Sequence, residues 1–394
     1  MNRLLAFLFV PVIFSCSAKL EKEEVLAEES SALLFDYTLD TVIIDSGDSK
    51  PYLDMKLVSS DYVASEGLLY NLDPGTGRVD VIDIAAQKLT DQIQFEIDGP
   101  NGIRRYFPTG IKKTSGDDLI IRDYYDILRM GTDKKLKDSY RLRNHTLAGD
   151  NLRDGQEING MGEVAQDGTF FASYYGYYPS NGPIMGLAKV DFASKSLRLI
   201  PVDFKEQSAK LTIRWDFREG KSTVIPEFKF LTLDKHNFIA SNTYKNELWY
   251  YDAGTDSVYH RVYKSKLTAN VKRGNFRKRV RSMREYTLAK NRKYQEVVFG
   301  PIVKDPTKQL FYRYSREVQQ VPDRGGSFFR FVLTVFDDQL NQVHEEKLAL
   351  SAAIPGEYYA NKTFVHQGML YTFLDLKSQL AFVRLKPTFY HEKN

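Results

Sequence analysis

Cysteine is almost absent from the sequence, because Cys16 is the only one in 394 residues. No disulfide can therefore form within the chain. The longest apolar run, Leu4 to Phe14, is shorter than the roughly 20 residues that a membrane-spanning helix needs. Neither sign of charge dominates, since 55 basic and 51 acidic residues leave a formal net charge of +4. Nothing in this balance requires nucleic acid as a partner.

Recognisable catalytic motifs are missing as well. The sequence has no Gly-x-Ser-x-Gly and no His-Glu-x-x-His, and its six histidines are scattered. Gly220-Lys221-Ser222 resembles the end of a phosphate-binding loop, but Trp215 stands where that motif needs glycine. We therefore expect no cofactor and name no catalytic residue, and the sequence favours a protein that is not an enzyme. It does not decide whether a metal is bound.

The N-terminus has the pattern of an export signal. Arg3 precedes the apolar run, and Ser15 and Cys16 follow it. This order resembles the lipobox of bacterial lipoproteins, which implies a signal peptide over 1–15 and a lipid, such as palmitate, on Cys16. An ordinary signal peptide that contains a cysteine is the alternative. We expect residues 16–33 to be a flexible linker and 34–394 to be the folded domain, held in the cell envelope as an outer-membrane lipoprotein facing the periplasm or the surface.

A repeat runs through the remaining chain. Aromatic residues make up 13% of the sequence, which favours strands. Six short apolar segments each follow a polar turn at intervals of roughly 50 to 70 residues. They begin at Leu68, Leu119, Phe170, Phe238, Leu310 and Met369. A strand, an Asp-rich turn and another strand follow in most of the units. This order predicts four strands per unit.

Six such units predict an all-β fold, a six-bladed β-propeller with four antiparallel strands per blade. Seven blades, a pair of β-sandwiches and a β-solenoid are the alternatives. The last repeat lacks a convincing fourth strand, and the segment Leu34 to Ile44 has strand character without a unit of its own. We therefore predict that this segment pairs with the last blade and closes the ring.

The lipobox around Cys16 and the six degenerate strand-turn-strand units together resemble the uncharacterised propeller lipoproteins of Bacteroidota, which are grouped as a domain of unknown function. The similarity covers nearly the whole mature chain, and it is one of pattern and length. It implies a monomeric propeller anchored to the membrane, and it supplies no catalytic residues.

Long connections are where function usually resides on a rigid scaffold. Propeller topology sends them all to one face, and they are 141–160, 174–184, 203–226, 263–298 and 314–328. One of them contains four tyrosines that suit contacts with sugars or peptides, namely Tyr174, Tyr175, Tyr177 and Tyr178. The alternative is that two of these rings simply cap the core.

Residues 264–293 are strongly basic and include Arg277, Arg279 and Arg281. We predict a short amphipathic helix here, with Asn275 as N-cap. Its apolar face would carry Phe276, Val280, Met283 and Thr287. The basic side could hold an acidic glycan, a lipid head group or an acidic partner, and a merely solvated face is the alternative.

Polar residues also recur near the ends of the second strands, where they could form a ring at the mouth of the axial channel. They are Asn71, Arg122, Ser173, Asn242, Arg313 and Thr372. Two functions follow from this inventory. The first is a non-enzymatic binding or scaffold module for a glycan, peptide or protein partner. The second is a propeller hydrolase, lyase or lactonase with carboxylates or a metal at the axis.

Overall fold

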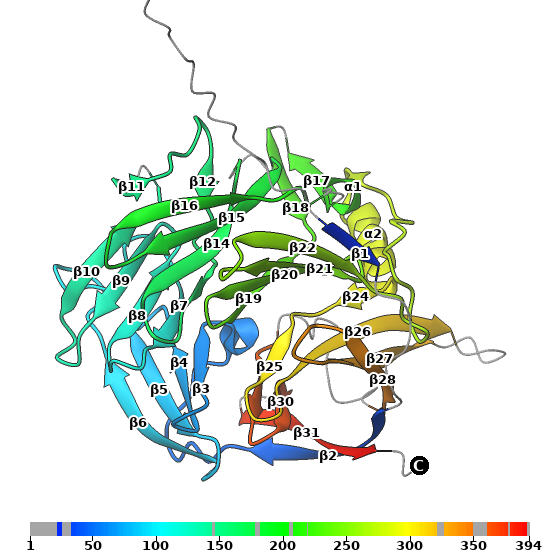
Figure 1. Cartoon of the computed structure of the whole chain (residues 1–394), viewed down its shortest axis with the longest axis horizontal. Helices are drawn as coiled ribbons and strands as arrows, with labels where there is room; N and C mark the ends of the chain where they lie inside the picture. The colour runs from blue at the N-terminus through cyan, green and yellow to red at the C-terminus, as the bar shows by residue number, and fades with distance from the viewer. Residues whose placement is uncertain are drawn as a thin grey trace, which may run out of the picture.

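The computed structural model describes residues 22–25, 33–143, 146–177, 182–204, 208–218, 220–320, 327–349, 361–376 and 379–391. The predicted signal peptide and Cys16 lie outside these ranges. Six sheets, each built around four antiparallel strands, follow one another in chain order around a centre (Figure 1). We number them sheet 1 to sheet 6. The fold is therefore all-β and propeller-like, as the repeat predicted.

The strands of the six sheets are as follows, in chain order within each sheet. Sheet 1 contains β3 (Ser60–Val63), β4 (Leu68–Leu72), β5 (Arg78–Asp83) and β6 (Lys88–Gln94), and sheet 2 contains β7 (Pro108–Lys113), β8 (Leu119–Asp123), β9 (Asp126–Met130) and β10 (Leu136–Arg141). Sheet 3 contains β11 (Ala148–Gly149), β12 (Glu157–Ile158), β13 (Glu163–Val164), β14 (Phe170–Gly176), β15 (Ile184–Asp191) and β16 (Ser196–Pro201). Sheet 4 contains β19 (Lys229–Asp234), β20 (Asn237–Asn242), β21 (Glu247–Asp252) and β22 (Ser257–Val262).

Sheet 5 contains β24 (Val298–Phe299), β25 (Val303–Asp305), β26 (Leu310–Gln320), β27 (Ser327–Phe336) and β28 (Gln342–Leu348), and sheet 6 contains β29 (Thr363–His366), β30 (Met369–Leu376) and β31 (Gln379–His391), with β2 (Leu33–Ile43) at its edge. A short 3-10 helix, η1 (Asp54–Leu57), precedes sheet 1. The strands that the repeat predicted are β4, β8, β14, β20, β26 and β30, and each begins within one residue of the predicted position.

The Asp-rich turns explain why the repeat is visible in the sequence. Asp191 accepts a hydrogen bond from the backbone N–H of Ser194, and Asp252 accepts one from Gly254. A residue with positive φ stands near the end of these turns, as at Lys195 and Asp256. A short polar side chain that bonds its own backbone stabilises such a tight turn, so the spacing of the turns sets the spacing of the strands.

The chain closes the ring with its own N-terminal strand, as predicted. β2 pairs antiparallel with β31 along its whole length, from Leu33 opposite His391 to Ile43 opposite Ala381. Asp40 and Arg384 add an ion pair across the two strands. The expectation of a wholly flexible linker over 16–33 is wrong for β1 (Lys22–Val25), which pairs parallel with β22 at the edge of sheet 4.

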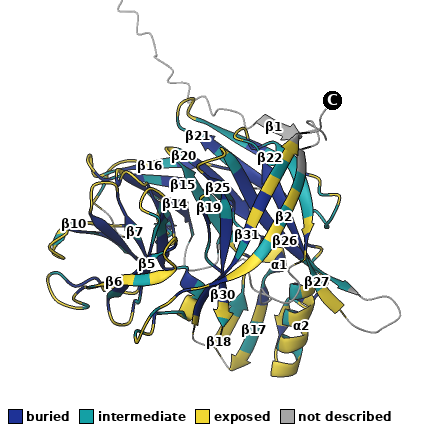
Figure 2. Cartoon of the chain, turned by 90° about the horizontal axis from the view of Figure 1, so that it is seen from below, coloured by how far each residue is buried: buried dark blue, intermediate teal, exposed yellow. Residues whose placement is uncertain are grey.

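The core lies between neighbouring sheets rather than inside them. One cluster of buried apolar side chains fills each of the six gaps, including the gap between sheets 6 and 1, where Phe364 and Tyr371 meet Leu69 and Ile82. Figure 2 shows buried residues along the inner strands and exposed ones on outer strands such as β6. Each sheet therefore depends on its neighbours to remove both of its faces from water.

Two long connections form an additional unit outside this ring, which we call the inserted module. It consists of α1 (Ser208–Leu211), β17 (Ile213–Arg218) and β18 (Lys221–Ile225) from the connection between sheets 3 and 4, and of β23 (Arg279–Val280) and α2 (Met283–Gln295) from the connection between sheets 4 and 5. Figure 2 shows β17, β18 and α2 projecting together from one side of the molecule. The module has its own buried cluster, to which Leu211, Phe276 and Ala289 belong.

Candidate functional site

The predicted tyrosine site is not exposed where the structure describes it. Tyr174 and Tyr175 are each only 6% exposed and belong to the cores on the two sides of sheet 3. The Tyr174 hydroxyl donates a hydrogen bond to the carbonyl oxygen of Phe230 in sheet 4, at 2.7 Å. The expectation of an open site is therefore wrong for these two rings, and the alternative of core packing holds. Tyr177 is half-buried, and Tyr178 lies outside the described residues.

The predicted polar ring is buried as well. Arg122 donates to the carbonyl oxygen of Gly162 and lies 3.3 Å from a carboxylate oxygen of Glu163, so it links sheet 2 to sheet 3. Arg313 donates to Asn246 and lies among aromatic rings. Asn242 accepts hydrogen bonds from the backbone of the turn after β20. We had expected these three residues to face a ligand, whereas they join or cap elements of the fold.

The other members of that predicted ring show the same burial. Asn71, Ser173 and Thr372 are at most 1% exposed. A polar residue at the end of a strand is therefore not necessarily exposed. Where the ends of neighbouring sheets pack together, buried backbone groups also need hydrogen-bonding side chains.

The basic stretch forms a helix, but not the predicted one. α2 begins at Met283, and its N-cap is Ser282, whose hydroxyl accepts a hydrogen bond from the N–H of Glu285. The expected N-cap Asn275 is wrong, because Phe276 and Val280 are buried in the core of the inserted module before the helix begins. Met283, expected on the buried face, is 59% exposed.

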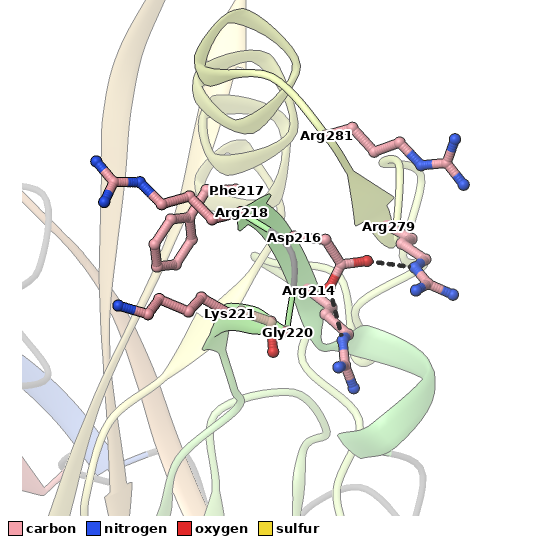
Figure 3. Close-up of a pocket in the computed structure, with 9 residues that line it drawn as sticks. Arg214, Asp216, Phe217, Arg218, Gly220, Lys221, Arg279 and Arg281 are labelled. Carbon is pink, nitrogen blue, oxygen red and sulfur yellow. Dashed lines mark hydrogen bonds and ion pairs between the residues drawn. The ribbon is translucent and has the colours of Figure 1, made fainter.

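Two arginines of this stretch and three basic residues of β17 and β18 line one shallow depression of about 500 Å³. Its lining contains Arg214, Asp216, Phe217, Arg218, Gly220, Lys221, Ser222, Arg279 and Arg281. Figure 3 shows Asp216 between Arg214 and Arg279, with Arg218, Lys221 and Arg281 extending away from it. We call this surface the cationic depression. Among the described residues that line it, five side chains are cationic and one, that of Asp216, is a carboxylate.

Strand register explains how distant residues meet here. β17 pairs parallel with β23, which places Arg214 beside Arg279 and Trp215 beside Val280. Because side chains alternate along a strand, Arg214 and Asp216 share one face. The pairing with β18 shifts register after Asp216, and Phe217 and Arg218 both line the depression. The Trp215 ring on the other face stacks on Tyr286 of α2, with 4.7 Å between ring centroids. The helix side of the sheet is thus packed, and the arginine side faces water.

Asp216 organises the arginines without cancelling their charge. It accepts hydrogen bonds from Nε of Arg214 at 2.9 Å and Nε of Arg279 at 2.5 Å, and these bonds hold the pKa of its carboxyl below the usual value. Arg277, which the sequence grouped with Arg279, instead pairs with Glu285 and does not line the depression. The contributions of Arg214 and Arg218 were missed, since β17 and β23 are more than 60 residues apart in the sequence.

A buried ion cluster anchors the inserted module to sheet 4. Glu227 accepts hydrogen bonds from Nζ of Lys272, and it lies 3.0 Å from Nζ of Lys293 on α2. The Lys293 ammonium also donates to three backbone carbonyl oxygens at 2.9 to 3.0 Å. Burial lowers the pKa of Lys293 to about 8, and Glu227 opposes this shift. The cluster fixes where α2 lies against β17.

Among the described residues, no group of three or more His, Cys, Asp or Glu side chains lies together as a metal site would require. None of the helices described is long and apolar enough to cross a membrane.

The ring of sheets places the chain among all-β, propeller-like proteins. A family model described as "Domain of unknown function (DUF4221)" matches residues 30–347, and the chain therefore belongs to this family. The crystal structure of a DUF4221 member from Bacteroides vulgatus ATCC 8482 is similar, with a TM-score of 0.59 and 12% identity, covering 91% of this chain and 98% of that one. The predicted resemblance to an uncharacterised Bacteroidota family is thus confirmed.

More distant structures include a putative exported protein from Bacteroides fragilis NCTC 9343, with a TM-score of 0.47, 10% identity and coverage of 89% of this chain and 95% of that one. A gluconolactonase from Xanthomonas campestris gives a TM-score of 0.41 at 11% identity, covering 89% and 90% of the two chains. No curated protein matches the chain.

Proposed function

We propose that this protein is an exported, membrane-anchored lipoprotein built as a six-bladed β-propeller, and that it acts as a non-enzymatic binding module for a polyanion. The observation that carries the proposal is the cationic depression, where five basic side chains surround Asp216. Asp216 forms its ion pairs with Arg214 and Arg279, whereas Arg218, Lys221 and Arg281 extend away from it (Figure 3). Like charges held together on a surface repel one another, so a bound anion would relieve this repulsion.

The shape of the depression supports a polymer rather than a small molecule. Small-molecule sites usually enclose most of their ligand, whereas this depression is more open than enclosed. Guanidinium groups also suit sulfate, phosphate and carboxylate groups, because their N–H donors can bind two oxygens at once. The enzyme alternative is not supported by any specific observation, since the described residues gather no axial carboxylate cluster.

The position of the N-terminus supports a ligand outside the anchoring membrane. If Cys16 carries the lipid, only five residues separate it from β1, a span of at most about 22 Å. β1 pairs with β22, which lies at the top of Figure 2, whereas the inserted module lies at the bottom. The depression would therefore face away from the membrane, which disfavours a lipid head group of that membrane as its ligand.

The proposal can be tested with dextran sulfate as the polyanion and uncharged dextran as its control. We expect the purified domain to bind dextran sulfate, and a triple variant Arg218→Gln, Lys221→Gln and Arg281→Gln to bind it roughly tenfold more weakly, since each exposed charge contributes about 0.5 kcal/mol. A matched triple variant removes three exposed lysines away from the module, Lys88→Gln at the start of β6 and Lys135→Gln and Lys235→Gln in the β9–β10 and β19–β20 connections. Equal losses in the two variants would contradict a specific site.

A further inference from the structure

A second surface with the chemistry of a ligand site lies on sheet 2, away from the inserted module. Tyr106 comes from the connection between sheets 1 and 2, and Tyr124 and Tyr125 form the turn between β8 and β9. The ring centroids of Tyr106 and Tyr125, and those of Tyr124 and Tyr125, are 4.9 Å apart. We call these three rings the tyrosine platform. No signal in the sequence singled it out, because its two segments are separated by β7 and β8.

One ring of the platform is unusually exposed for so large a side chain. Tyr106 is 62% exposed, whereas Tyr124 and Tyr125 are half-buried. Phe107, next in the sequence, is 46% exposed, and Met161, in the connection between β12 and β13, is 60% exposed. Single exposed apolar residues are common, but several large ones in adjoining loops cost free energy in water and usually mark a binding site.

A buried carboxylate holds the platform in shape. Asp123, which is fully buried, accepts hydrogen bonds from the backbone N–H groups of Tyr106 at 2.9 Å, Arg105 at 3.3 Å and Tyr125 at 3.4 Å. It therefore ties the connection before β7 to the turn after β8. Burying a carboxylate costs free energy unless hydrogen bonds to it offset that cost. These three bonds do so for Asp123, and in return they fix the backbone that carries the exposed rings.

Sheet 3 supports the platform from the other side. A Cβ atom on Gly160 would lie 2.0 Å from the carbonyl oxygen of Tyr124, so only glycine allows this close approach. The Arg143 guanidinium lies over the Tyr125 ring, 5.0 Å from its centroid, and forms an ion pair of 3.0 Å with Glu157. Tyr125 is thus covered on one side, while Tyr106 keeps its ring in water.

We propose that the tyrosine platform is a carbohydrate-binding site at which Tyr106 stacks on a sugar ring. A pyranose has an apolar face of C–H groups and a rim of hydroxyl groups. Tyr106 offers the matching flat apolar surface, and the hydroxyl groups of the tyrosines, together with the Glu157 carboxylate near Tyr124, offer polar partners. Rings fixed before the ligand arrives lose little conformational entropy on binding.

A peptide fits this surface less well. Extended peptides usually bind by adding a strand to an open sheet edge, where the main chain finds hydrogen-bonding partners. The platform residues instead lie in a turn and in a connection, at the ends of β7, β8 and β9. The site is also separate from the cationic depression, so this inference does not rest on the proposed polyanion function.

The test uses soluble xylan, mannan and β-glucan as neutral probes, with binding followed by affinity gel electrophoresis and calorimetry. We expect the wild-type chain to bind at least one of them, and Tyr106→Ala to weaken that binding about fivefold to tenfold through the loss of stacking. Tyr106→Phe should retain most of the affinity, because the ring remains. Tyr390→Ala, which removes another exposed tyrosine, should have no effect.

Asp123→Asn tests the positioning role, and its melting temperature is measured alongside. A loss of polysaccharide affinity in a variant that remains folded supports the inference. The inference is overturned if no neutral probe binds, if Tyr106→Ala binds as the wild type does, or if a proline-rich peptide is the ligand that Tyr106→Ala loses. Dextran sulfate is titrated in parallel with the triple variant of the depression, so that failure of one site is distinguished from failure of the other.

Discussion

Among single residues, Glu227 does most to fix the inserted module, although it does not line the cationic depression. Its carboxylate lies between the ammonium groups of Lys272 and Lys293 and accepts a hydrogen bond from Thr243 at 2.6 Å. Burial would raise the pKa of this carboxyl, but the two lysines outweigh it and hold the pKa below the usual value. A buried ion cluster of this kind stabilises the fold only as a complete set, because each remaining charge needs its partner.

Replacing Glu227 with glutamine should therefore destabilise the protein strongly. The change leaves two buried ammonium groups facing each other without a carboxylate, and we expect the free energy of unfolding to fall by about 3–5 kcal/mol. Urea denaturation followed by circular dichroism measures the loss. Glu96→Gln on the surface is the matched control and should change stability by less than about 0.5 kcal/mol. Similar values for both variants would show that the buried cluster is not a structural anchor.

Lys293 should also give the stability a characteristic dependence on pH. Burial lowers its pKa to about 8 from the ordinary 10.5. Between these two values the unfolded chain binds a proton at this position and the folded chain does not, so the free energy of unfolding increases with pH there. Below about pH 8 both states are protonated and the contribution is constant. We expect wild type to gain stability relative to Lys293→Met between pH 8 and pH 10, measured by urea denaturation. A relative loss would contradict the lowered pKa.

Among elements, the sequence predicted best what depends on local chemistry. The strands β4, β8, β14, β20, β26 and β30 begin where the repeat placed them, because each follows a tight polar turn with a residue at positive φ. The closing strand was predictable too, since an unpaired strand at one end of the chain matched a missing strand at the other. What could not be predicted depends on contacts between distant segments. β17 pairs with β23 although all of sheet 4 lies between them in the sequence, and nothing local to Arg214 indicates its pairing with Arg279.

Residue patterns that occur both in the core and at the surface were the other source of wrong predictions. The pair Tyr174–Tyr175 and the pair Tyr124–Tyr125 look alike in the sequence. The first pair belongs to a strand and points into the cores on both sides of sheet 3, whereas the second pair forms a turn and remains half-buried beside Tyr106. Only the location of the strand end, one or two residues away, separates a core residue from a candidate binding residue.

Removing the closing strand should destabilise the entire domain. Deletion of residues 30–45 takes away β2, which supplies the outer strand of sheet 6 and leaves β31 with an open edge. We expect a lower midpoint of thermal unfolding and faster aggregation, since an exposed strand edge pairs readily with other chains. Removing residues 17–25, which include β1 but leave β2 in place, is the control and should affect the midpoint much less. A single cooperative transition at an unchanged midpoint after the larger deletion would exclude the closing role of β2.

For the whole molecule, the proposed lipid on Cys16 is the point of attachment to the membrane. Cys16 is the only thiol and directly follows the apolar run and Ser15. Changing Cys16→Ala should abolish incorporation of labelled palmitate in cells and release the protein from the membrane fraction. Ser17→Ala, the adjacent change, should leave both unaltered. Unchanged labelling of the Cys16→Ala protein would end the lipoprotein proposal while leaving both binding sites to be tested on the isolated domain.

The two candidate sites should differ in their response to salt. Binding of dextran sulfate at the cationic depression depends on exposed charges, whose interactions are screened beyond about 8 Å at physiological ionic strength. Raising sodium chloride from 50 mM to 500 mM should therefore weaken it strongly, and the triple variant Arg218→Gln, Lys221→Gln and Arg281→Gln should show a shallower dependence, because fewer counterions are exchanged on binding.

Stacking of a neutral sugar on Tyr106 involves no net charge and buries apolar surface, so binding of a neutral polysaccharide should change little over the same range. Calorimetric titrations at the two salt concentrations make the comparison on a single preparation. If neutral and sulfated polymers lose affinity in parallel, the two ligands share one electrostatic surface and the division into two sites is wrong. If Tyr106→Ala alters the salt dependence of dextran sulfate, the platform lies within reach of the same chain, and the two sites then bind one acidic polysaccharide together.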